Sequence, residues 1–132
     1  MSSGRFAAAI NCMDGRTQIP VVSYMTQKFH VDYVDMITEL GPARVIAERS
    51  DASALQSIRR RLEISIEKHG SKVVAVVGHY DCAANAVEME TQLQQIARSI
   101  QTITSWCLEV KVMGLWIDEK WSPHHVDENS RD

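Results

Sequence analysis

An uninterrupted apolar run in the middle of the chain constrains the fold more than any other feature. Residues 73–77 read Val-Val-Ala-Val-Val, which is rich in β-branched side chains and too short for a helix of comparable burial. A continuous apolar pattern, rather than an alternating one, predicts a strand buried on both faces, as in a parallel sheet covered by helices. Residues 6–10 form a similar run that ends at Asn11-Cys12, and they predict a second buried strand.

Three segments with helical periodicity lie between and after these runs. The first is expected to take Thr17 as its cap, with Pro20 in its first turn. The second is expected to begin at Ser50 or Asp51 and to end at Gly70, a typical helix stop. The side chains expected to face the core are Val21, Val22, Met25 and Phe29 in the first helix, Leu55, Ile58, Leu62 and Ile66 in the second, and Val87, Met89, Leu93, Ile96, Ile100 and Ile103 in the third.

Two further strands are predicted, in residues 31–37 and within residues 108–117. Strands that alternate with helices favour an α/β fold with a mainly parallel sheet, right-handed crossovers and helices on both faces. Residues 1–121 are expected to form this single domain, because 132 residues suit one compact core. Residues 122–132 are polar and are expected to form a frayed C-terminal tail.

Composition excludes several classes of function. The net charge of -3, from 14 basic and 17 acidic residues, offers no excess of cations for a phosphate backbone, so nucleic acid is not an expected partner. No apolar run approaches the roughly 20 residues of a membrane helix, and the N-terminus lacks the pattern of a signal peptide. The three cysteines are widely spaced, which fits a reducing compartment. We therefore expect a soluble, cytoplasmic protein without disulfides or a membrane association.

Two cysteines and one histidine follow the predicted strands at their carboxyl ends. Cys12 follows the first buried run, and His79 and Cys82 follow the second. Ligands of parallel α/β sheets bind beyond the carboxyl ends of the strands, so these side chains converge if the two strands are neighbours. Two thiolates and one imidazole form a typical zinc-binding set, and a catalytic site holds three such ligands and leaves a fourth position open. Asp14 is a candidate for that fourth position.

These residues also carry a resemblance to a known family. Cys12-Met13-Asp14-Gly15-Arg16 after an N-terminal strand, and Gly78-His79-Tyr80-Asp81-Cys82 after a later one, resemble the β-class carbonic anhydrases. Residues 112–118 resemble the late strand of that family, with its glycine and aspartate. The resemblance implies the β-carbonic anhydrase fold and a short, N-terminally truncated member of the family.

The resemblance implies a zinc lyase that hydrates carbon dioxide reversibly to bicarbonate. Cys12, His79 and Cys82 would bind Zn²⁺, and a zinc-bound hydroxide, formed at a pKa near roughly 7, would attack carbon dioxide. Asp14 and Arg16 would be the catalytic pair. When Asp14 pairs with Arg16 it orients the hydroxide, whereas as a fourth zinc ligand it would close the site.

Several positions depart from the family pattern and leave alternatives open. Only eleven residues precede Cys12, where the family usually has a helical extension that supplies a substrate-side glutamine; Gln18 is a candidate substitute. The family's arginine-asparagine-alanine-glycine stretch is replaced in residues 38–43, and the glycine after the second cysteine is Ala83. One alternative is a hydrolase of carbonyl sulfide or carbon disulfide. Another is a non-catalytic zinc protein in which Asp14 closes the metal site.

The remaining candidate ligands are expected to have no role in the metal site. Cys107 beside Trp106 is expected to be a buried, small apolar residue, and His124 and His125 belong to the predicted tail. The family builds its active-site clefts at subunit contacts, so the resemblance implies a homodimer or a larger homo-oligomer. A cysteine phosphatase is a poor alternative, because its loop has five residues between cysteine and arginine, whereas Cys12 and Arg16 have three between them.

Overall fold

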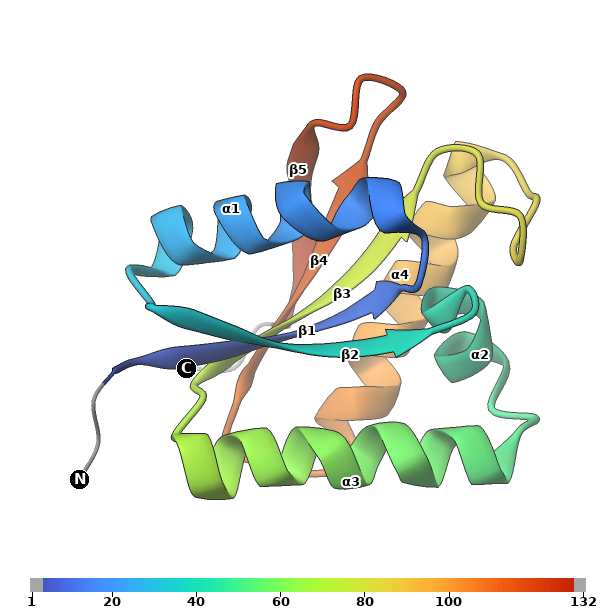
Figure 1. The fold of residues 1–132 in the computed structure, drawn as a ribbon. Helices are drawn as coiled ribbons and strands as arrows, with labels where there is room; N and C mark the ends of the chain where they lie inside the picture. Colours follow the sequence, from blue (N-terminus) through green and yellow to red (C-terminus); the bar gives the residue numbers. More distant parts are fainter. Residues whose placement is uncertain (1–3, 130–132) are drawn as a thin grey trace.

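Five strands form one sheet in the order β2-β1-β3-β4-β5, as shown by a computed structural model that describes residues 4–129. The first four strands run parallel, and β5 pairs antiparallel with β4 at the edge (Figure 1). The predicted α/β class with a mainly parallel sheet is therefore confirmed. The strands are β1 (Phe6–Cys12), β2 (Tyr33–Glu39), β3 (Val73–His79), β4 (Lys111–Ile117) and β5 (Pro123–Glu128).

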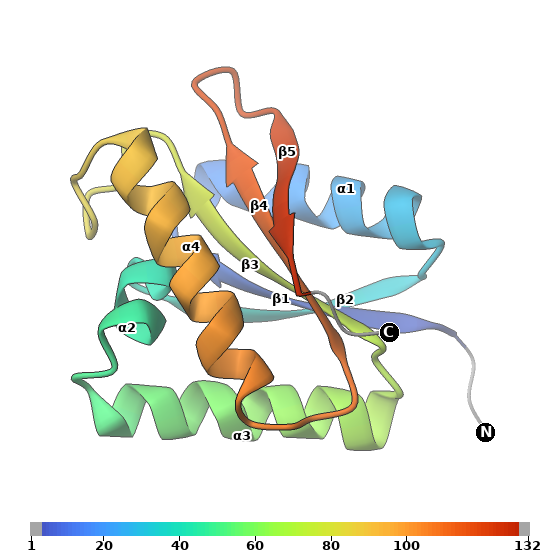
Figure 2. The same ribbon diagram turned by 180° about the vertical axis from the view of Figure 1, so that it is seen from behind.

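Helices cover both faces of the sheet, as Figures 1 and 2 show from opposite sides. One face is covered by α1 (Gln18–Phe29), which follows a short 3₁₀ turn (Gly15–Thr17). The other face is covered by α2 (Pro42–Glu48), α3 (Ala52–His69) and α4 (Met89–Thr104). Within residues 4–129, no helix has both the length and the apolar character needed to cross a membrane.

The two faces of the sheet bury separate apolar clusters, because successive side chains of a strand point to opposite faces. Ala8, Ile10, Val74 and Val76 pack toward α2, α3 and α4. Ala7, Ala9, Ala75 and Val77 alternate with them and pack toward α1. Every residue of β3 is buried, which explains the continuous apolar pattern of its sequence.

The ends of α3 form as predicted. Asp51 caps the helix by accepting a hydrogen bond from the Ala54 amide at 3.0 Å. Gly70 ends it with φ +72°, a left-handed conformation that glycine adopts without steric cost. Of the predicted stripe, Ile58 and Leu62 are fully buried, and Leu55 and Ile66 pack against the core at its margin.

Other details of the helices differ from the prediction. Thr17 makes no side-chain capping bond to α1, because its hydroxyl donates to the Asp14 carbonyl instead. Val22 is exposed on the outer side of α1. Met89 is exposed at the first position of α4, and Val87 is exposed in the loop before that helix. Helix α2 was not predicted, although Pro42 at its first position after Gly41 is a recognised start signal. Its seven residues are too few for a convincing periodic pattern.

The prediction of a frayed C-terminal tail is wrong for residues 123–128. They form β5, which pairs with β4 from Met113 to Ile117 with an irregularity between Gly114 and Leu115. This strand is mostly exposed, so its sequence carries no apolar signal, and its order depends on backbone hydrogen bonds to β4. The last part of the predicted tail, residues 130–132, lies outside the described residues. Cys107 is exposed rather than buried at the end of α4.

Replacing Asp118 with alanine is expected to lower the thermal stability modestly. The Asp118 carboxylate organises the β4–β5 turn by accepting hydrogen bonds from the Lys120 and Ser122 amides at 2.9 and 3.0 Å. His124 and these amides lower the pKa of Asp118 in the folded protein. Its stabilising effect is therefore fully present above the ordinary aspartate pKa and is lost as the pH falls from there through the lowered pKa of the folded state. We expect Tm to fall by about 2–4 °C at pH 7.

Thermal unfolding followed by circular dichroism at pH 7 and pH 3 checks this prediction. The difference in Tm between Asp118→Ala and the wild type should shrink at pH 3, because the Asp118 carboxyl of the unfolded wild type is then protonated and folding has to release that proton. An equal difference at both pH values would contradict the role of the charged form.

Candidate metal centre

The three predicted metal ligands meet at the carboxyl edge of the sheet, where β1 and β3 separate. These strands pair only from Ala8 to Ile10 on β1 and from Val74 to Val76 on β3. Beyond that point Cys12 ends β1, His79 ends β3, and Cys82 follows in the next loop. The predicted adjacency of the two strands is confirmed, and it brings the ligands together.

Distances and burial within this cluster fit a zinc ion. The Sγ atoms of Cys12 and Cys82 are 3.9 Å apart, and the donor atoms of the three residues all lie within 4.8 Å of one another. Two sulfurs in a tetrahedral site with Zn–S bonds of about 2.3 Å would be about 3.8 Å apart. The side chains are almost inaccessible, with exposures of 4% for Cys12, 1% for His79 and 5% for Cys82.

The His79 ring is oriented by its own loop, with one nitrogen left for a ligand. Nδ1 lies 2.7 Å from the Tyr80 carbonyl oxygen and donates a hydrogen bond to it. This fixes the tautomer in which Nε2 carries a lone pair, as second-shell partners do at zinc sites. Nε2 is buried and has no hydrogen-bond partner among residues 4–129, which is costly in a protein interior unless a metal or another ligand engages the atom.

The two thiols differ in how readily they ionise. Burial by itself raises the pKa of Cys12, but the His79 ring and the backbone amides near Gly41 and Asp14 outweigh it and lower the pKa to about 7. Burial raises the pKa of Cys82, and the neighbouring Cys12 raises it further. Metal ions bind thiolates, so binding has to displace the Cys82 proton and is favoured as the pH rises.

Asp14 lies beside this cluster but is paired with Arg16. The guanidinium Nε and Nη2 donate to Asp14 Oδ1 and Oδ2 at 3.0 and 2.7 Å, and the Arg16 amide also donates to Oδ1 at 2.9 Å. Bonds from Arg16 outweigh the effect of burial and lower the pKa of Asp14 to about 2. Asp14 Oδ2 is 4.0 Å from His79 Nε2. The carboxylate is therefore both ionised, because of its low pKa, and close to the cluster.

Two residues that the sequence analysis did not single out hold Arg16 in place. Asp81 accepts from Nη1 through its carboxylate at 3.3 Å and from Nη2 through its backbone carbonyl at 3.1 Å. The Trp121 ring lies against the guanidinium, with Cζ 4.4 Å from the ring centroid. Asp81 lies within the His-Tyr-Asp-Cys motif, so the sequence offered a signal for it. Trp121 comes from the β4–β5 turn and has no informative spacing.

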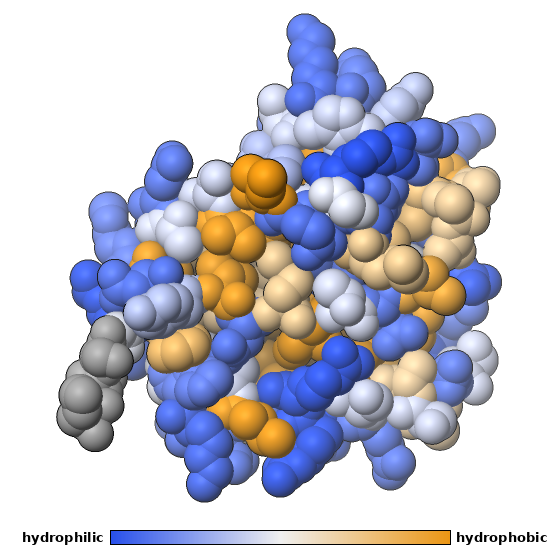
Figure 3. Space-filling model, in the orientation of Figure 1, coloured by the Kyte–Doolittle hydropathy of each residue, from blue (hydrophilic) through white to orange (hydrophobic). Residues whose placement is uncertain are grey.

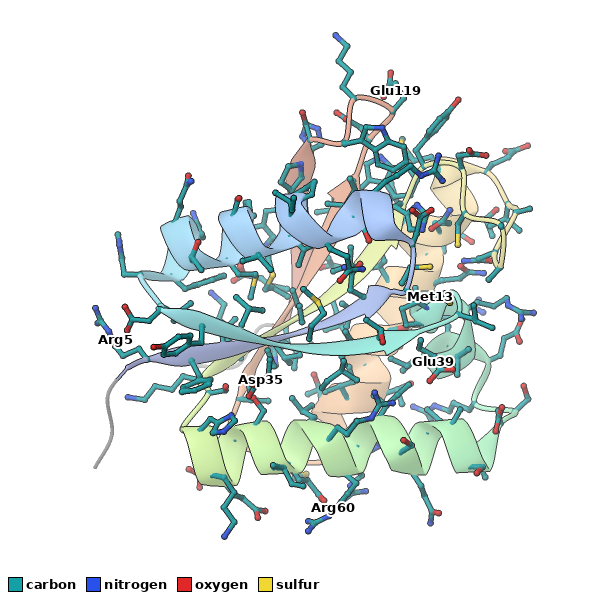
Figure 4. The ribbon with its side chains drawn as sticks, viewed as in Figure 1. Arg5, Met13, Asp35, Glu39, Arg60 and Glu119 are labelled. Carbon is teal, nitrogen blue, oxygen red and sulfur yellow. The ribbon has the colours of Figure 1, made fainter. Side chains whose placement is uncertain are left out.

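A small cavity of about 370 Å³ lies next to the cluster. It is lined by Cys12, Met13, Asp14, Leu40, Ala83 and Ala84, so its walls are mainly apolar. Figure 4 shows Met13 at the end of β1 beside Glu39 at the end of β2, and the Met13 amide donates to the Glu39 carbonyl at 3.1 Å. Gln18, the candidate substitute for the family's glutamine, does not line this cavity. Instead, its Nε2 donates to the Cys12 and Asp14 carbonyls at 2.8 and 3.1 Å and so holds the loop that follows β1.

Comparison with known proteins identifies the family. A sequence model of the family described as "Putative carbonic anhydrase" matches residues 2–127, nearly the whole chain. The fold matches solved β-carbonic anhydrases over most of the chain. The chain belongs to this family of putative carbonic anhydrases, and its fold is that of the β-class enzymes. No curated protein sequence matches it.

Similar solved structures include β-carbonic anhydrases from a protozoan and from filamentous fungi. Isoform I from the protozoan Trichomonas vaginalis has a TM-score of 0.61 and 14% identity, with 92% of this chain and 82% of that chain covered. CafD from the fungus Aspergillus fumigatus, solved as a cysteine-to-alanine mutant, has a TM-score of 0.58 and 13% identity, with coverage of 94% and 90%. One of two enzymes from Sordaria macrospora, described as tetrameric, has a TM-score of 0.54 and 12% identity, with coverage of 96% and 82%. At such identities these structures establish the fold of this carbonic anhydrase family member and not its activity.

Proposed function

We propose that this β-carbonic anhydrase family member is a zinc enzyme that hydrates carbon dioxide reversibly to bicarbonate. The observation that carries the proposal is the position of Asp14, whose Oδ2 lies 4.0 Å from the unpartnered Nε2 of His79 while Arg16 holds the carboxylate through two hydrogen bonds. An ionised carboxylate is thus kept beside the metal cluster without being free to join it. This arrangement favours an open site over the closed alternative.

Cys12, His79 and Cys82 would hold the zinc, since their donor atoms fit its coordination geometry. Zinc in such a site lowers the pKa of bound water and so supplies a nucleophile near neutral pH. The protein's own residues then orient the reactants. Asp14 accepts a hydrogen bond from the attacking group, and Arg16, held by Asp81 and Trp121, keeps Asp14 ionised and in position.

The adjacent cavity supports a small apolar substrate. Met13, Leu40, Ala83 and Ala84 provide its walls, and no amide or hydroxyl side chain is among the described lining residues. Carbon dioxide carries no charge and fits such walls, and the same argument supports carbonyl sulfide or carbon disulfide. Hydrolysis of these sulfur analogues is therefore the second candidate function, because it would use the same metal site and cavity.

We infer that the active form is a homodimer or a larger homo-oligomer in the cytoplasm. Met13 and Leu40, which line the cavity, are 61% and 56% exposed, and Ile19 on the outer side of α1 is 78% exposed. Apolar side chains gather on the surface around α1 and α2 in Figure 3, as expected where a second subunit covers a site. The tetrameric relative from Sordaria macrospora supports this inference. The buried, unpaired thiols of Cys12 and Cys82 support a reducing compartment.

Stopped-flow measurement of carbon dioxide hydration by the zinc-loaded protein, from pH 6.5 to pH 9, tests the proposed activity. The rate should rise with pH to a plateau, with its midpoint near roughly 7–8, and zinc removal should abolish it. A zinc-loaded protein without hydration at any pH would overturn the proposal. Release of hydrogen sulfide from carbonyl sulfide under the same conditions would then favour the second candidate.

A further inference from the structure

The backbone of His79 lacks its expected strand partner at the point where the sheet opens. β3 pairs with β4 along its whole length, up to His79 opposite Ile117, but its pairing with β1 stops at Val76. The Tyr80 amide donates to the Ile117 carbonyl at 2.9 Å and so points toward β4. Backbone groups of successive strand residues point to opposite edges of the strand. The amide and carbonyl of His79 therefore point away from β4, toward the side on which β1 has separated from β3.

A buried glutamine from α4 takes the place of that strand. Gln92 Nε2 donates to the His79 carbonyl at 2.9 Å, and the His79 amide donates to Gln92 Oε1 at 3.2 Å. One primary amide thus satisfies both backbone groups, in the way that a neighbouring strand would. Gln92 is only 3% exposed, so neither bond competes with solvent.

The surrounding residues make this contact specific. A Cβ at Gly78 would lie 3.0 Å from Gln92 Oε1 and 3.1 Å from Ile96 Cδ1, so a residue without a side chain lets α4 approach β3. The side chain of Gln92 spans from the first turn of α4 to the last residue of β3. Gln92 is neither a member of the metal cluster nor one of the residues that line the adjacent cavity.

We propose that Gln92 is a positioning residue, which sets the place of the metal ligand His79 by holding its backbone where the sheet opens. Separation of β1 and β3 is needed to make room for an ion between Cys12 and His79, yet it removes the hydrogen bonds that would fix His79. Gln92 restores them from α4, and the Tyr80 carbonyl then sets the ring about that fixed backbone. The inference rests on the proposed metal site and deepens it.

Zinc affinity, measured by competition with a chromophoric chelator at pH 7.5, tests the role of Gln92. Gln92→Met keeps the size of the side chain and loses both hydrogen bonds. Gln92→Asn keeps the amide, but its side chain is one methylene shorter and does not reach the His79 backbone. Both variants should bind zinc about 10–100-fold more weakly, as is typical when an outer-shell partner of a metal ligand is lost. The Co²⁺-loaded variants should also show altered ligand-field absorption, since the geometry of the site changes.

Two control variants separate positioning from general stabilisation. Ser99→Ala removes another buried hydrogen bond from the same helix, in which Oγ donates to the Ala43 carbonyl at 2.9 Å. It should lower the thermal stability of the zinc-free protein while zinc affinity stays within twofold of the wild type. Gln94→Leu, at an exposed position of α4, should change neither property.

The possible failures are distinguishable from one another. Wild-type zinc affinity in a folded Gln92→Met protein would overturn the positioning role and leave the metal site intact. A wild-type protein without zinc affinity would overturn both. Hydrogen exchange of the His79 amide in the wild type is a measurement that needs no variant to fold. Slow exchange, comparable with that of Val76, is expected, and exchange as fast as in an exposed loop would overturn the proposal.

Discussion

Replacing Cys82 with alanine is expected to reduce zinc content from about one ion per chain to near zero. In the part of the chain that the structure describes, the cluster offers only three donors of the kind that zinc prefers, and all of them are buried within 4.8 Å of one another. Asp14 cannot readily replace the lost thiolate, because Arg16 engages both of its oxygens. Removing one of three ligands therefore leaves too few bonds to offset the desolvation of the ion.

Metal analysis of purified protein after dialysis checks this prediction, with Cys107→Ala as the matched control. Cys107 is the only other cysteine, and it is exposed at the end of α4, away from the cluster. The control should retain about one zinc per chain. Zinc should raise Tm for the wild type and the control but not for Cys82→Ala, since only a folded site binds it. Full zinc retention in Cys82→Ala would remove the proposed metal site.

Replacing Asp14 with alanine is expected to reduce carbon dioxide hydration about 100-fold while zinc remains bound. The size of this effect is typical for loss of a group that positions a reactant or shares its proton. Asp14 is ionised over the whole working range, since its pKa is held at about 2, so it acts as a hydrogen-bond acceptor and not as a titrating base. The ratio of the variant and wild-type rates should therefore be nearly constant from pH 6.5 to pH 9.

Asp81→Ala is the informative comparison for this experiment, assayed by the same stopped-flow method. Both carboxylates bond to Arg16, but only Asp14 lies near His79 Nε2, and Asp81 is 68% exposed. We expect Asp81→Ala to lower hydration less than about threefold, since solvent-exposed ion pairs contribute little. Equal losses in the two variants would mean that the placement of Arg16 matters and the Asp14 carboxylate does not.

The residues of the metal cluster were predictable as candidate ligands because they follow the strongest local patterns in the chain. The apolar run that forms β3 places His79 at the end of that strand, and the run that forms β1 places Cys12 at the end of its strand. Parallel strands share one carboxyl edge, so convergence needed only the adjacency of β1 and β3. Asp14 and Arg16 are two residues apart, and their pairing follows from local geometry. The contacts of Gln18 were not predictable, because sequence does not reveal that its amide bonds to the backbone of the loop before it.

Sequence patterns by themselves determined the α/β class, the central strands, the bounds of α3 and the residues that meet at the metal cluster. These features depend on local periodicity and on rules that hold for all parallel sheets. Only the tertiary structure decided that residues 123–128 form β5, that Trp121 packs on Arg16 and that Gln92 holds the His79 backbone. Each of these joins polar or exposed groups from distant segments, and single polar residues carry no periodic signal. Their partners depend on where β1 and β3 separate and on where β5 joins the edge of the sheet. Both are established only by the packing of the whole chain.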